Sequence, residues 1–264
     1  MEPLPLKQTT DLSSKVAIVT GGAMGIGFGI AYRLAEAGAS VAIADRDKGA
    51  ADESAAKLVA KGWKSIAVAV DVSLAEQVAR MVEIVISSYD GIDILVNDAG
   101  IYPNVPVMQM QEKDFDRILA INLKGAFLCT KAVAEQMIKR GRGGRIINVT
   151  SIDAIHPSMV GLAVYDASKH GLWGFTKNVA LELAQHKIWV NAIAPGGIST
   201  PGTGRGGPVN KEMEEMLKPF LAKIPMHRMG EPDEIGKVAL FLASDLSSYM
   251  TGSQIVVDGG VLLA

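Results

Sequence analysis

A tyrosine and a lysine, Tyr165 and Lys169, lie four residues apart in a stretch of helix-forming composition. Residues at this spacing share one face of a helix, so the phenol and the ammonium can act together. A phenol with a pKa near 10 is a poor base at neutral pH. A nearby ammonium and a positively charged cofactor ring both favour the phenolate, so we expect them to lower the pKa of Tyr165. The pair therefore predicts a site that exchanges a proton with a substrate hydroxyl.

A glycine-rich turn precedes this pair in the chain. Gly21, Gly25 and Gly27 lie in the sequence TGGAMGIG (20–27), between an apolar run and a helical pattern. A dinucleotide pyrophosphate needs close approach to the backbone and free N–H groups at a helix start, where side chains would block it. A carboxylate, Asp45, ends the next apolar run, twenty residues after Gly25. This context predicts a dinucleotide-binding turn.

The same carboxylate predicts which dinucleotide binds. Asp45 can accept hydrogen bonds from both hydroxyls of the adenosine ribose, and it would repel a 2′-phosphate. Arg46, the next residue, is the opposing signal, because an arginine there can hold a 2′-phosphate. We expect NAD as the cofactor, with NADP less favoured.

Apolar runs and helical patterns alternate along almost the whole chain. The runs are rich in Val and Ile, which is typical of strands covered on both faces. They lie at 16–20, 40–45, 65–71, 92–97, 145–150, 187–194 and 254–259, and the helical patterns lie at 25–38, 47–61, 74–88, 112–139 and 163–185. This alternation predicts an α/β protein with a single-domain Rossmann fold, in which helices cover both faces of a doubly wound, seven-stranded parallel sheet.

Two segments fall outside that pattern. Residues 1–12 are polar and contain proline, and we expect a flexible arm before one domain at 13–264. The Gly/Pro-rich stretch at 195–210 follows a predicted strand, and we expect a substrate lid at about 197–225. Apolar side chains that recur there at helical spacing are expected to cover the substrate: Met213, Met216, Leu217, Phe220 and Leu221.

Composition excludes several classes of protein. The chain has 264 residues, 48% of them hydrophobic, and a formal net charge of -2, which argues against broad binding to nucleic acid or anionic membranes. It lacks an apolar run long enough to span a bilayer, and its N-terminus does not read as a secretory signal. The one cysteine, Cys129, excludes an internal disulfide and is expected to pack, and the four histidines lack metal-site spacing. We expect a cytoplasmic protein with a small-molecule substrate and no metal.

Taken together, the motifs resemble the short-chain dehydrogenase/reductase family over about residues 15–260. They are TGGAMGIG (20–27), Asp71-Val72, NDAG (97–100), Asn122 in INLKG, Ser151, YDASK (165–169) and PGGIST (195–200). The Tyr-x-x-x-Lys spacing alone occurs easily by chance. An ordered set in which the motifs follow successive predicted strands is far more specific.

The resemblance implies a catalytic set of Ser151, Tyr165, Lys169 and Asn122. Tyr165 would take the hydroxyl proton during oxidation and return it during reduction. Lys169 would also hold the nicotinamide ribose, and Ser151 would hydrogen-bond the substrate oxygen and stabilise alkoxide charge. Asn122 would anchor a water that links Lys169 to solvent.

The resemblance also implies the contacts of the cofactor, which would supply the hydride chemistry. Asp71 and Val72 would hold the adenine, residues of the NDAG motif would form the floor, and residues after the sixth strand would cradle the nicotinamide. The predicted cofactor-binding residues are Gly21, Met24, Gly25, Ile26, Gly27, Asp45, Arg46, Asp71, Val72, Asn97, Ala99, Gly100, Tyr165, Lys169, Pro195, Gly196, Ile198 and Thr200. The predicted substrate pocket contains Tyr102, Asp153, His156 and Gly197, although His156 and Asp153 read equally well as solvated loop residues.

Two departures from the family pattern stand out. Ser151 lies fourteen residues before Tyr165, one more than usual, so the loop between them carries an extra residue. Ser158 sits in mid-loop, so Ser151 remains the better candidate. Asp98 stands where the family has asparagine, and we expect it to influence local hydrogen bonds or cofactor affinity without carrying the chemistry.

These features predict an NAD-dependent oxidoreductase that acts on a secondary alcohol or its ketone, such as a polyol, a sugar or another small hydroxy compound. One alternative is an NADPH-dependent reductase of 3-oxoacyl thioesters on an acyl carrier. The basic residues Lys139, Arg140, Arg142 and Arg145 could dock such a carrier, but such residues more often complement a helix end. A remote alternative is a non-catalytic cofactor sensor. The resemblance also implies a homotetramer built through helices 112–139 and 163–185 and the last strand.

Overall fold

Seven strands form one parallel sheet in the order β3-β2-β1-β4-β5-β6-β7. The computed structural model describes residues 5–201 and 221–264. The strands are β1 (Val16–Thr20), β2 (Ser40–Asp45), β3 (Ser65–Ala69), β4 (Ile94–Asn97), β5 (Gly144–Val149), β6 (Ile188–Pro195) and β7 (Gln254–Val257). The prediction of a doubly wound, seven-stranded parallel sheet is confirmed.

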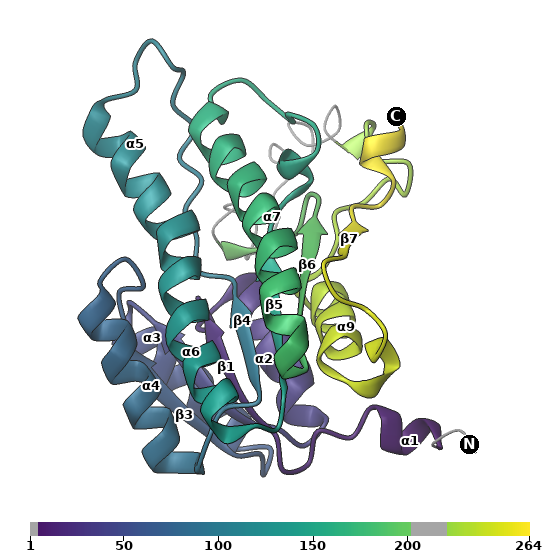
Figure 1. Cartoon of the computed structure of the whole chain (residues 1–264). Helices are drawn as coiled ribbons and strands as arrows, with labels where there is room; N and C mark the ends of the chain where they lie inside the picture. Colours follow the sequence, from purple (N-terminus) through teal and green to yellow (C-terminus); the bar gives the residue numbers. More distant parts are fainter. Residues whose placement is uncertain (1–4, 202–220) are drawn as a thin grey trace.

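Helices cover both faces of this sheet (Figure 1). They are α1 (Leu6–Thr9), α2 (Gly25–Glu36), α3 (Lys48–Val59), α4 (Ala75–Tyr89), α5 (Glu112–Leu119), α6 (Ala126–Arg140), α7 (Ala163–Leu183) and α9 (Pro232–Ala243). One layer contains α2, α3 and α9, and the other contains α4, α6 and α7. Within the described ranges, no helix combines the length and hydropathy needed to cross a bilayer.

Each layer buries its own apolar core against the sheet. Ile30 and Leu34 of α2 pack with Leu242 of α9 on one face, where all three side chains are fully buried. On the other face, Met137 of α6 packs with Cys129, which confirms that this cysteine is a packing residue. Burying an aliphatic side chain of this size contributes about 1.5–3 kcal/mol, so the two cores hold the strand ends in place.

The sheet has a topological switch point at β1, which lies between β2 and β4. Thr20 at the end of β1 pairs with Asn97 at the end of β4. Chain crossovers leave these two strands in opposite directions, so their carboxyl ends open a crevice, where open α/β sheets bind ligands. The glycine turn and the NDAG motif therefore face each other across that crevice.

The structure differs from the predicted elements in three places. The single helix expected at 112–139 is interrupted by a π-helical turn, η1 (Ala120–Gly125), which carries Asn122. Helix α9 was not predicted, although Glu231, Pro232 and Glu234 form a proline-containing capping box at its start. At the N-terminus, Leu12 is only 2% exposed and its N–H donates to the Ala37 carbonyl at 2.8 Å, so the anchored chain begins before residue 13.

The predicted lid falls mainly on residues 202–220, which lie outside the described residues together with Met213, Met216, Leu217 and Phe220. The lid remains a prediction. Leu221 is described and is half-buried.

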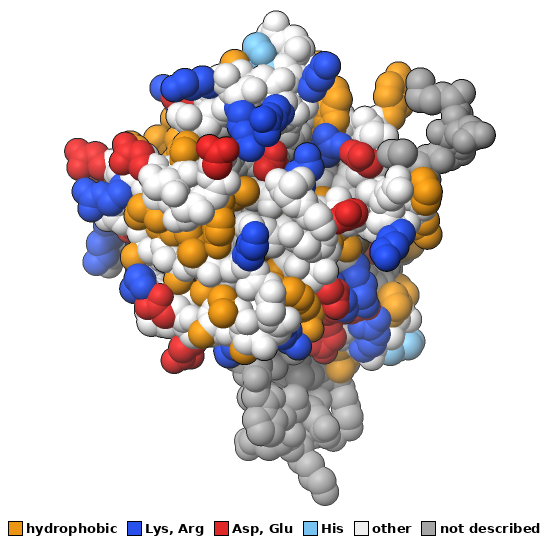
Figure 2. Space-filling model, turned by 90° about the horizontal axis from the view of Figure 1, so that it is seen from below, with side chains coloured by type: hydrophobic (Ala, Val, Ile, Leu, Met, Phe, Trp, Pro, Cys, Tyr) orange, Lys and Arg blue, Asp and Glu red, His pale blue; other side chains and the backbone are white. Residues whose placement is uncertain are grey.

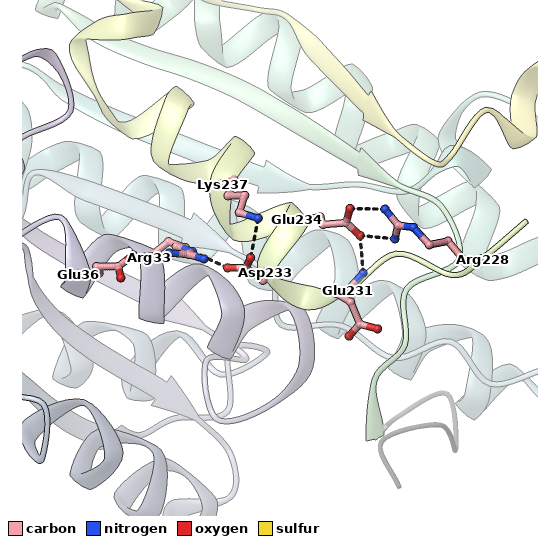
Figure 3. A network of polar contacts seen from close by, with 7 residues as sticks. All are labelled: Arg33, Glu36, Arg228, Glu231, Asp233, Glu234 and Lys237. Carbon is pink, nitrogen blue, oxygen red and sulfur yellow. Dashed lines mark hydrogen bonds and ion pairs between the residues drawn. The ribbon is translucent and has the colours of Figure 1, made fainter. Parts of the chain in front are cut away.

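Charged side chains join α2 to α9 on the outside of the molecule (Figure 3). Arg33 of α2 donates to Asp233 of α9 and to Glu36, and Lys237 pairs with Asp233 at 2.8 Å. A second pair, Arg228 with Glu234, is bidentate at 2.8 and 2.7 Å.

This outer network holds the chain segment that precedes α9. Glu234 also accepts the backbone N–H of Glu231 at 2.8 Å, next to Gly230. Gly230 forms a β-bridge with Ile198, and its N–H donates to the Gly197 carbonyl at 2.9 Å. Residues near Arg228 and α9 thereby fix the start of the loop that follows β6.

Candidate active site

The glycine turn forms a cradle without side chains at the start of α2. Gly21 and Gly25 have φ values of 66° and 56°, which favour glycine. A Cβ atom on Gly27 would lie 2.2 Å from the Gly21 carbonyl oxygen, so only glycine fits there. Met24 and Ile26 flank this cradle at the helix start. The open backbone at a helix N-terminus fits a dinucleotide pyrophosphate.

Asp45 lies beside this cradle at the end of β2. Its Oδ2 atom accepts the backbone N–H of Ala23 at 3.2 Å, and its Oδ1 atom accepts that of Asp47 at 3.1 Å. The carboxylate is therefore held at the edge of the turn. Arg46 is exposed to solvent. The structure thus brings both predicted determinants of cofactor choice to one place.

The predicted adenine contacts follow β3. Asp71 Oδ1 accepts the backbone N–H of Ser73 at 2.9 Å and the Ser73 hydroxyl at 2.6 Å. These hydrogen bonds lower the pKa of Asp71, mainly through the hydroxyl, and keep it charged. Val72 is buried and packs against the position where Gly125 lacks a side chain. Asp71 is therefore a fixed acceptor at the strand end.

The Asn97 side chain does not face the crevice. Its amide donates to Thr130 on α6 at 3.0 Å and to Asn148 on β5 at 2.8 Å, and Asn148 donates to Thr176 on α7 at 2.9 Å. This buried chain of polar groups ties the sheet to one helix layer, and sequence reasoning missed Asn148. On the crevice side, the Ala99 backbone lies 2.9 Å from the Cβ position of Gly21.

The loop after β6 returns to the glycine cradle. Gly196 N–H donates to the Val257 carbonyl at 3.0 Å, just beyond Pro195. Thr200 lies 3.3 Å from the Cβ position of Gly25. The Ile198 side chain is 5% exposed and packs into the core beside α2 and α9, so only its backbone can serve a cofactor.

Ser151, Tyr165 and Lys169 come together above the ends of β5 and β6. Lys169 Nζ donates to the Val149 carbonyl at 2.7 Å and lies 5.7 Å from the centre of the Tyr165 ring. The Ser151 hydroxyl is close enough to Tyr165 to favour its phenolate. Ser151 is 6% exposed and Lys169 is 5% exposed. The predicted triad is thus assembled, with Ser151 and Lys169 buried and Tyr165 half-buried.

Burial controls the ionisation of this group. It raises the pKa of Tyr165, with further contributions from the charges of Asp153 and Asp98, whereas the Ser151 hydroxyl opposes the shift. For the chain by itself the direction is thus opposite to the predicted one, because loss of water is the largest contribution. The lowering expected with a positively charged cofactor ring beside the phenol stays a prediction. Burial also lowers the pKa of Lys169, and both carboxylates partly offset this effect.

Asp98 lies between the glycine cradle and Lys169. One of its oxygens is 2.8 Å from the Cβ position of Gly27, and the Gly27 backbone favours the charged carboxylate. Burial raises the pKa of Asp98, and the charge of Lys169 opposes the shift. Asp98 thus lies close to the cradle and interacts through its charge with Lys169, and its expected influence on local hydrogen bonds or cofactor affinity stays a prediction.

Asn122 is buried in the π-helical turn. Its amide pairs with both backbone groups of Ile101 at 2.9 Å and donates to Ser168 at 3.1 Å. Asn122 Oδ1 lies 3.4 Å and Lys169 Nζ lies 3.7 Å from the Cβ position of Gly100. Asn122 thus joins the loop after β4 to α7 beside the lysine.

Two loops form the outer wall of the site. Asn104 donates to the Val160 carbonyl at 2.8 Å, and Val105 N–H donates to the Gly161 carbonyl at 2.8 Å. The loop from Ser151 to Tyr165 thereby accommodates its extra residue without losing the contact between these two side chains.

Two of the predicted pocket residues reach the centre of the site. The Tyr102 ring packs edge-on against Tyr165, with centroids 6.1 Å apart, and Asp153 accepts the Ser151 hydroxyl at 2.8 Å. His156 is exposed on the loop, and no described contact joins its ring to the triad.

The basic cluster lies near the amino-terminal end of β5, whereas the site lies at the carboxyl ends of the strands. Arg140 pairs with Asp93 at 3.5 Å and Arg145 pairs with Asp245 at 3.3 Å. On the face shown in Figure 2, Lys and Arg side chains are interspersed with Asp and Glu side chains. Gly144 begins β5 beside this cluster, whereas Ser151 follows the other end of the strand, so a carrier docked on the cluster would not face the triad.

Within the described ranges, no cluster of His, Cys, Asp and Glu could hold a metal ion.

Known proteins match this chain over nearly its whole length. A family model described as enoyl-(acyl carrier protein) reductase matches residues 21–262. A 3-oxoacyl-[acyl-carrier-protein] reductase of Synechocystis is 40% identical over 258 residues, which cover 96% of this chain and 99% of that protein. Dehydrogenase/reductase SDR family member 4 of Oryctolagus cuniculus is 42% identical, with 94% of each chain covered.

Solved structures share the fold over nearly the whole length. A short-chain type dehydrogenase/reductase from Mycobacterium marinum has a TM-score of 0.91 and 37% identity, covering 97% of this chain and 99% of that chain. A putative NAD(P) dependent gluconate 5-dehydrogenase from Beutenbergia cavernae, with NADP bound at low occupancy, has a TM-score of 0.89 and 32% identity, covering 97% of this chain and 100% of that chain. With the glycine cradle, the triad and these matches together, the chain belongs to the short-chain dehydrogenase/reductase family of oxidoreductases.

Proposed function

We propose that the protein is an NAD-dependent oxidoreductase that interconverts a secondary alcohol and its ketone, the substrate being a polyol, a sugar or another small hydroxy compound. The observation that carries this proposal is the grouping of Tyr165 with the buried Ser151 and Lys169, beside a glycine cradle at whose edge Asp45 lies. A bound nicotinamide dinucleotide would supply the hydride acceptor or donor.

The side chains divide the remaining work. Tyr165 takes the hydroxyl proton of the alcohol in oxidation and returns it to the ketone oxygen in reduction. Lys169 donates one of its three ammonium protons to Val149, which leaves two for the ribose hydroxyls of the cofactor. Ser151 contacts the substrate oxygen, and Asn122 holds the water path from Lys169 to solvent.

The preference for NAD rests on Asp45. Its carboxylate is anchored by two backbone N–H groups at the edge of the cradle, where it would accept ribose hydroxyls and repel a 2′-phosphate. Arg46 beside it is exposed and is the residue through which NADP could still bind.

The second candidate function is an NADPH-dependent reductase of 3-oxoacyl thioesters. Several relatives at about 40% identity carry the name 3-oxoacyl-[acyl-carrier-protein] reductase, which favours this function at least as well. Asp45 opposes it, because a carboxylate would repel the 2′-phosphate of NADPH.

The test is a substrate panel read at 340 nm, with NAD and NADP in parallel. It contains butan-2-ol, butane-2,3-diol, gluconate, polyols and aldoses in the oxidative direction, and acetoin and an acetoacetyl thioester with the reduced cofactors. Turnover of a hydroxy compound with NAD supports the proposal. Efficient thioester reduction with NADPH would replace it by the second candidate.

A matched pair of variants ties turnover to this site. Tyr165→Phe removes the proton donor and is expected to lower kcat by about 10²- to 10⁴-fold. Tyr249→Phe makes the same chemical change at a fully exposed tyrosine and should leave kcat unchanged. Full activity of Tyr165→Phe would contradict the mechanism.

We also propose that the protein forms a homotetramer through α5–α6, α7 and the edge strand β7. Between α6 and α7, Phe127 is 44% exposed and lies against the half-buried Phe175, with ring centroids 6.3 Å apart. Leu263 near the C-terminus is 89% exposed. Light scattering after gel filtration should give four times the chain mass of 27.9 kDa. A monomer mass would refute this assembly.

A further inference from the structure

The two loops that form the outer wall of the site carry a group of exposed apolar side chains. One loop follows β4 and the other joins β5 to α7. Their large apolar side chains that are between 45% and 92% exposed are Tyr102, Val107, Met108, Ile155, Met159 and Val160. Single exposed apolar residues are common on protein surfaces, but a group of them beside a site points to an apolar ligand. We call these six side chains the apolar rim.

The two loops are joined to each other along the rim. The Asn104 amide donates to the Val160 carbonyl at 2.8 Å and to the Met159 sulfur at 3.5 Å. The Val105 N–H donates to the Gly161 carbonyl at 2.8 Å. The rim side chains of both loops therefore belong to one continuous wall.

The rim reaches the reacting groups at its inner end. The Tyr102 ring packs edge-on against Tyr165, with centroids 6.1 Å apart. Ile155 directly follows the short helical turn η2 (Ile152–Ala154), which begins after Ser151. A substituent on the reacting carbon would therefore meet the rim as it leaves Tyr165 and Ser151.

Two polar side chains of the wall are already engaged with the loops themselves. The Asn104 amide donates to the Val160 carbonyl, and the oxygens of Asp153 accept the Ser151 hydroxyl at 2.8 Å and the Ser158 N–H at 2.9 Å. A hydroxyl group that leaves water without a partner costs free energy, whereas a methylene group that leaves water is stabilising. The wall therefore favours an apolar substituent over a chain of hydroxyl groups.

We propose that the apolar rim binds an alkyl chain of the substrate, so that the protein acts on secondary alcohols with an apolar chain of several carbons and on the matching ketones. This inference rests on the proposed function, and it narrows the substrate to small hydroxy compounds other than polyols and sugars. The reacting hydroxyl lies at Tyr165, and the chain extends along Ile155 and Met159. A methionine suits this role because its flexible side chain adapts to chains of different shape.

A series of alcohols tests the rim in the full chain, with the cofactor that it prefers in the panel. From butan-2-ol through hexan-2-ol to octan-2-ol, kcat/KM should rise by about 2- to 4-fold for each methylene group that the rim covers. Hexane-1,5-diol is the matched control for hexan-2-ol, because it keeps the same secondary alcohol and adds one hydroxyl at the far end of the chain. Its kcat/KM should be lower by about 10-fold.

Two variants make the rim polar with little change in size. Ile155→Asn and Met159→Gln should each lower kcat/KM for octan-2-ol by about 3- to 10-fold and leave that for butan-2-ol within about 2-fold. A purely structural role of either residue would lower both values alike. Ile84→Asn makes the same change on α4, where the isoleucine is 40% exposed, compared with 47% for Ile155. This control should keep the chain-length dependence of the unmodified protein.

Three results would overturn the inference while the proposed function stands: no rise of kcat/KM with chain length, a higher kcat/KM for polyols or gluconate than for octan-2-ol, or an unchanged chain-length dependence in both rim variants. An unchanged dependence together with an altered oligomer mass in these variants would mean that the rim meets a second copy of the chain. Absence of turnover with every alcohol and ketone would overturn the proposed function, and the inference with it.

Discussion

Two groups of charged side chains respond to their surroundings in opposite ways. One is the buried group around Tyr165, with Lys169 and the carboxylates of Asp98 and Asp153. The other is the outer network between α2 and α9 in Figure 3, where the Arg33 and Asp233 side chains are 25% and 40% exposed.

In the buried group, loss of water moves the pKa values toward the neutral forms. Burial raises the pKa of Asp98 and of Tyr165 and lowers that of Lys169. In the outer network, paired side chains favour the charged forms: hydrogen bonds from Arg33 and Arg228 lower the pKa of Asp233 and of Glu234 to about 2.

The comparison shows how the fold separates stability from chemistry. The exposed pairs connect α9 to α2 and to the chain at Gly230, and their charges stay solvated and screened by water. In the buried group, burial brings the pKa of Asp98 and of Lys169 closer to neutral pH and moves that of Tyr165 away from it. Four variants, ordered from the largest expected effect to the smallest, test this contrast.

Lys169→Met removes the one cation of the buried group. Because carboxylates would then face Tyr165 without a balancing charge, and the ribose contact would be lost, we expect kcat/KM to fall by about 10²- to 10⁴-fold. Steady-state kinetics on the compound found in the panel measure this loss. The near-normal activity of such a variant would mean that the lysine is only a packing residue.

Asp98→Asn removes the buried carboxyl while keeping its shape. The folded-state pKa of Asp98 lies above its ordinary value of 3.8, so the folded chain binds this proton more tightly than the unfolded chain. Stability is therefore lost as the pH rises from 3.8 through the folded pKa. At pH 8 the Asp98→Asn variant should therefore lose less folding stability than the unmodified chain, by on the order of 1 kcal/mol.

Urea unfolding at several pH values checks this expectation for Asp98. The curves of the two proteins should coincide near pH 4 and separate toward pH 8, with the variant more stable. The same stability difference at every pH would show that the charge of Asp98 is not involved.

Asp233→Asn breaks the centre of the outer network and should show the opposite pH dependence. The pKa of Asp233 is lowered to about 2, so its contribution is present above the unfolded value of 3.8 and is lost as the pH falls through 2. Because the side chain is 40% exposed, the variant should lose less than about 1 kcal/mol at pH 7. Unfolding at pH 7 and pH 2 would test this, with the two proteins equal at pH 2.

Arg228→Gln removes an exposed partner at the rim of the same network. Solvent screens its bidentate pair with Glu234, where the arginine side chain is 48% exposed. We expect the melting temperature to stay within the error of the measurement, at low and high salt alike. A clear destabilisation would show that the Arg228 pair contributes more to stability than solvent screening of an exposed pair allows.

Most of the architecture could be predicted because it rests on local patterns. The strands at 16–20 and 40–45 have the predicted bounds, and the glycine cradle lies where its spacing indicated. Helix α9 was missed, although its capping box at Glu231 and Glu234 was a usable signal. The π-helical turn that carries Asn122 had no such signal, because helical composition continues through it.

The site shows where local patterns stop being sufficient. Residue type and spacing in the sequence singled out Tyr165, Lys169 and Ser151, and the structure brings these three side chains together. Burial by segments far away in the chain raises the pKa of Asp98 and, for the chain by itself, that of Tyr165, and no local pattern indicated either effect.

The sequence by itself determined the family, the order of strands and helices, and the residue types that chemistry requires, since these follow from periodicity and short motifs. Only the tertiary structure decided which charged side chains are buried, that the Asn97 side chain points away from the crevice, and that the Ser151 hydroxyl donates to Asp153. Solvation and hydrogen-bond direction are set by neighbours brought together from distant segments, and no local pattern encodes them.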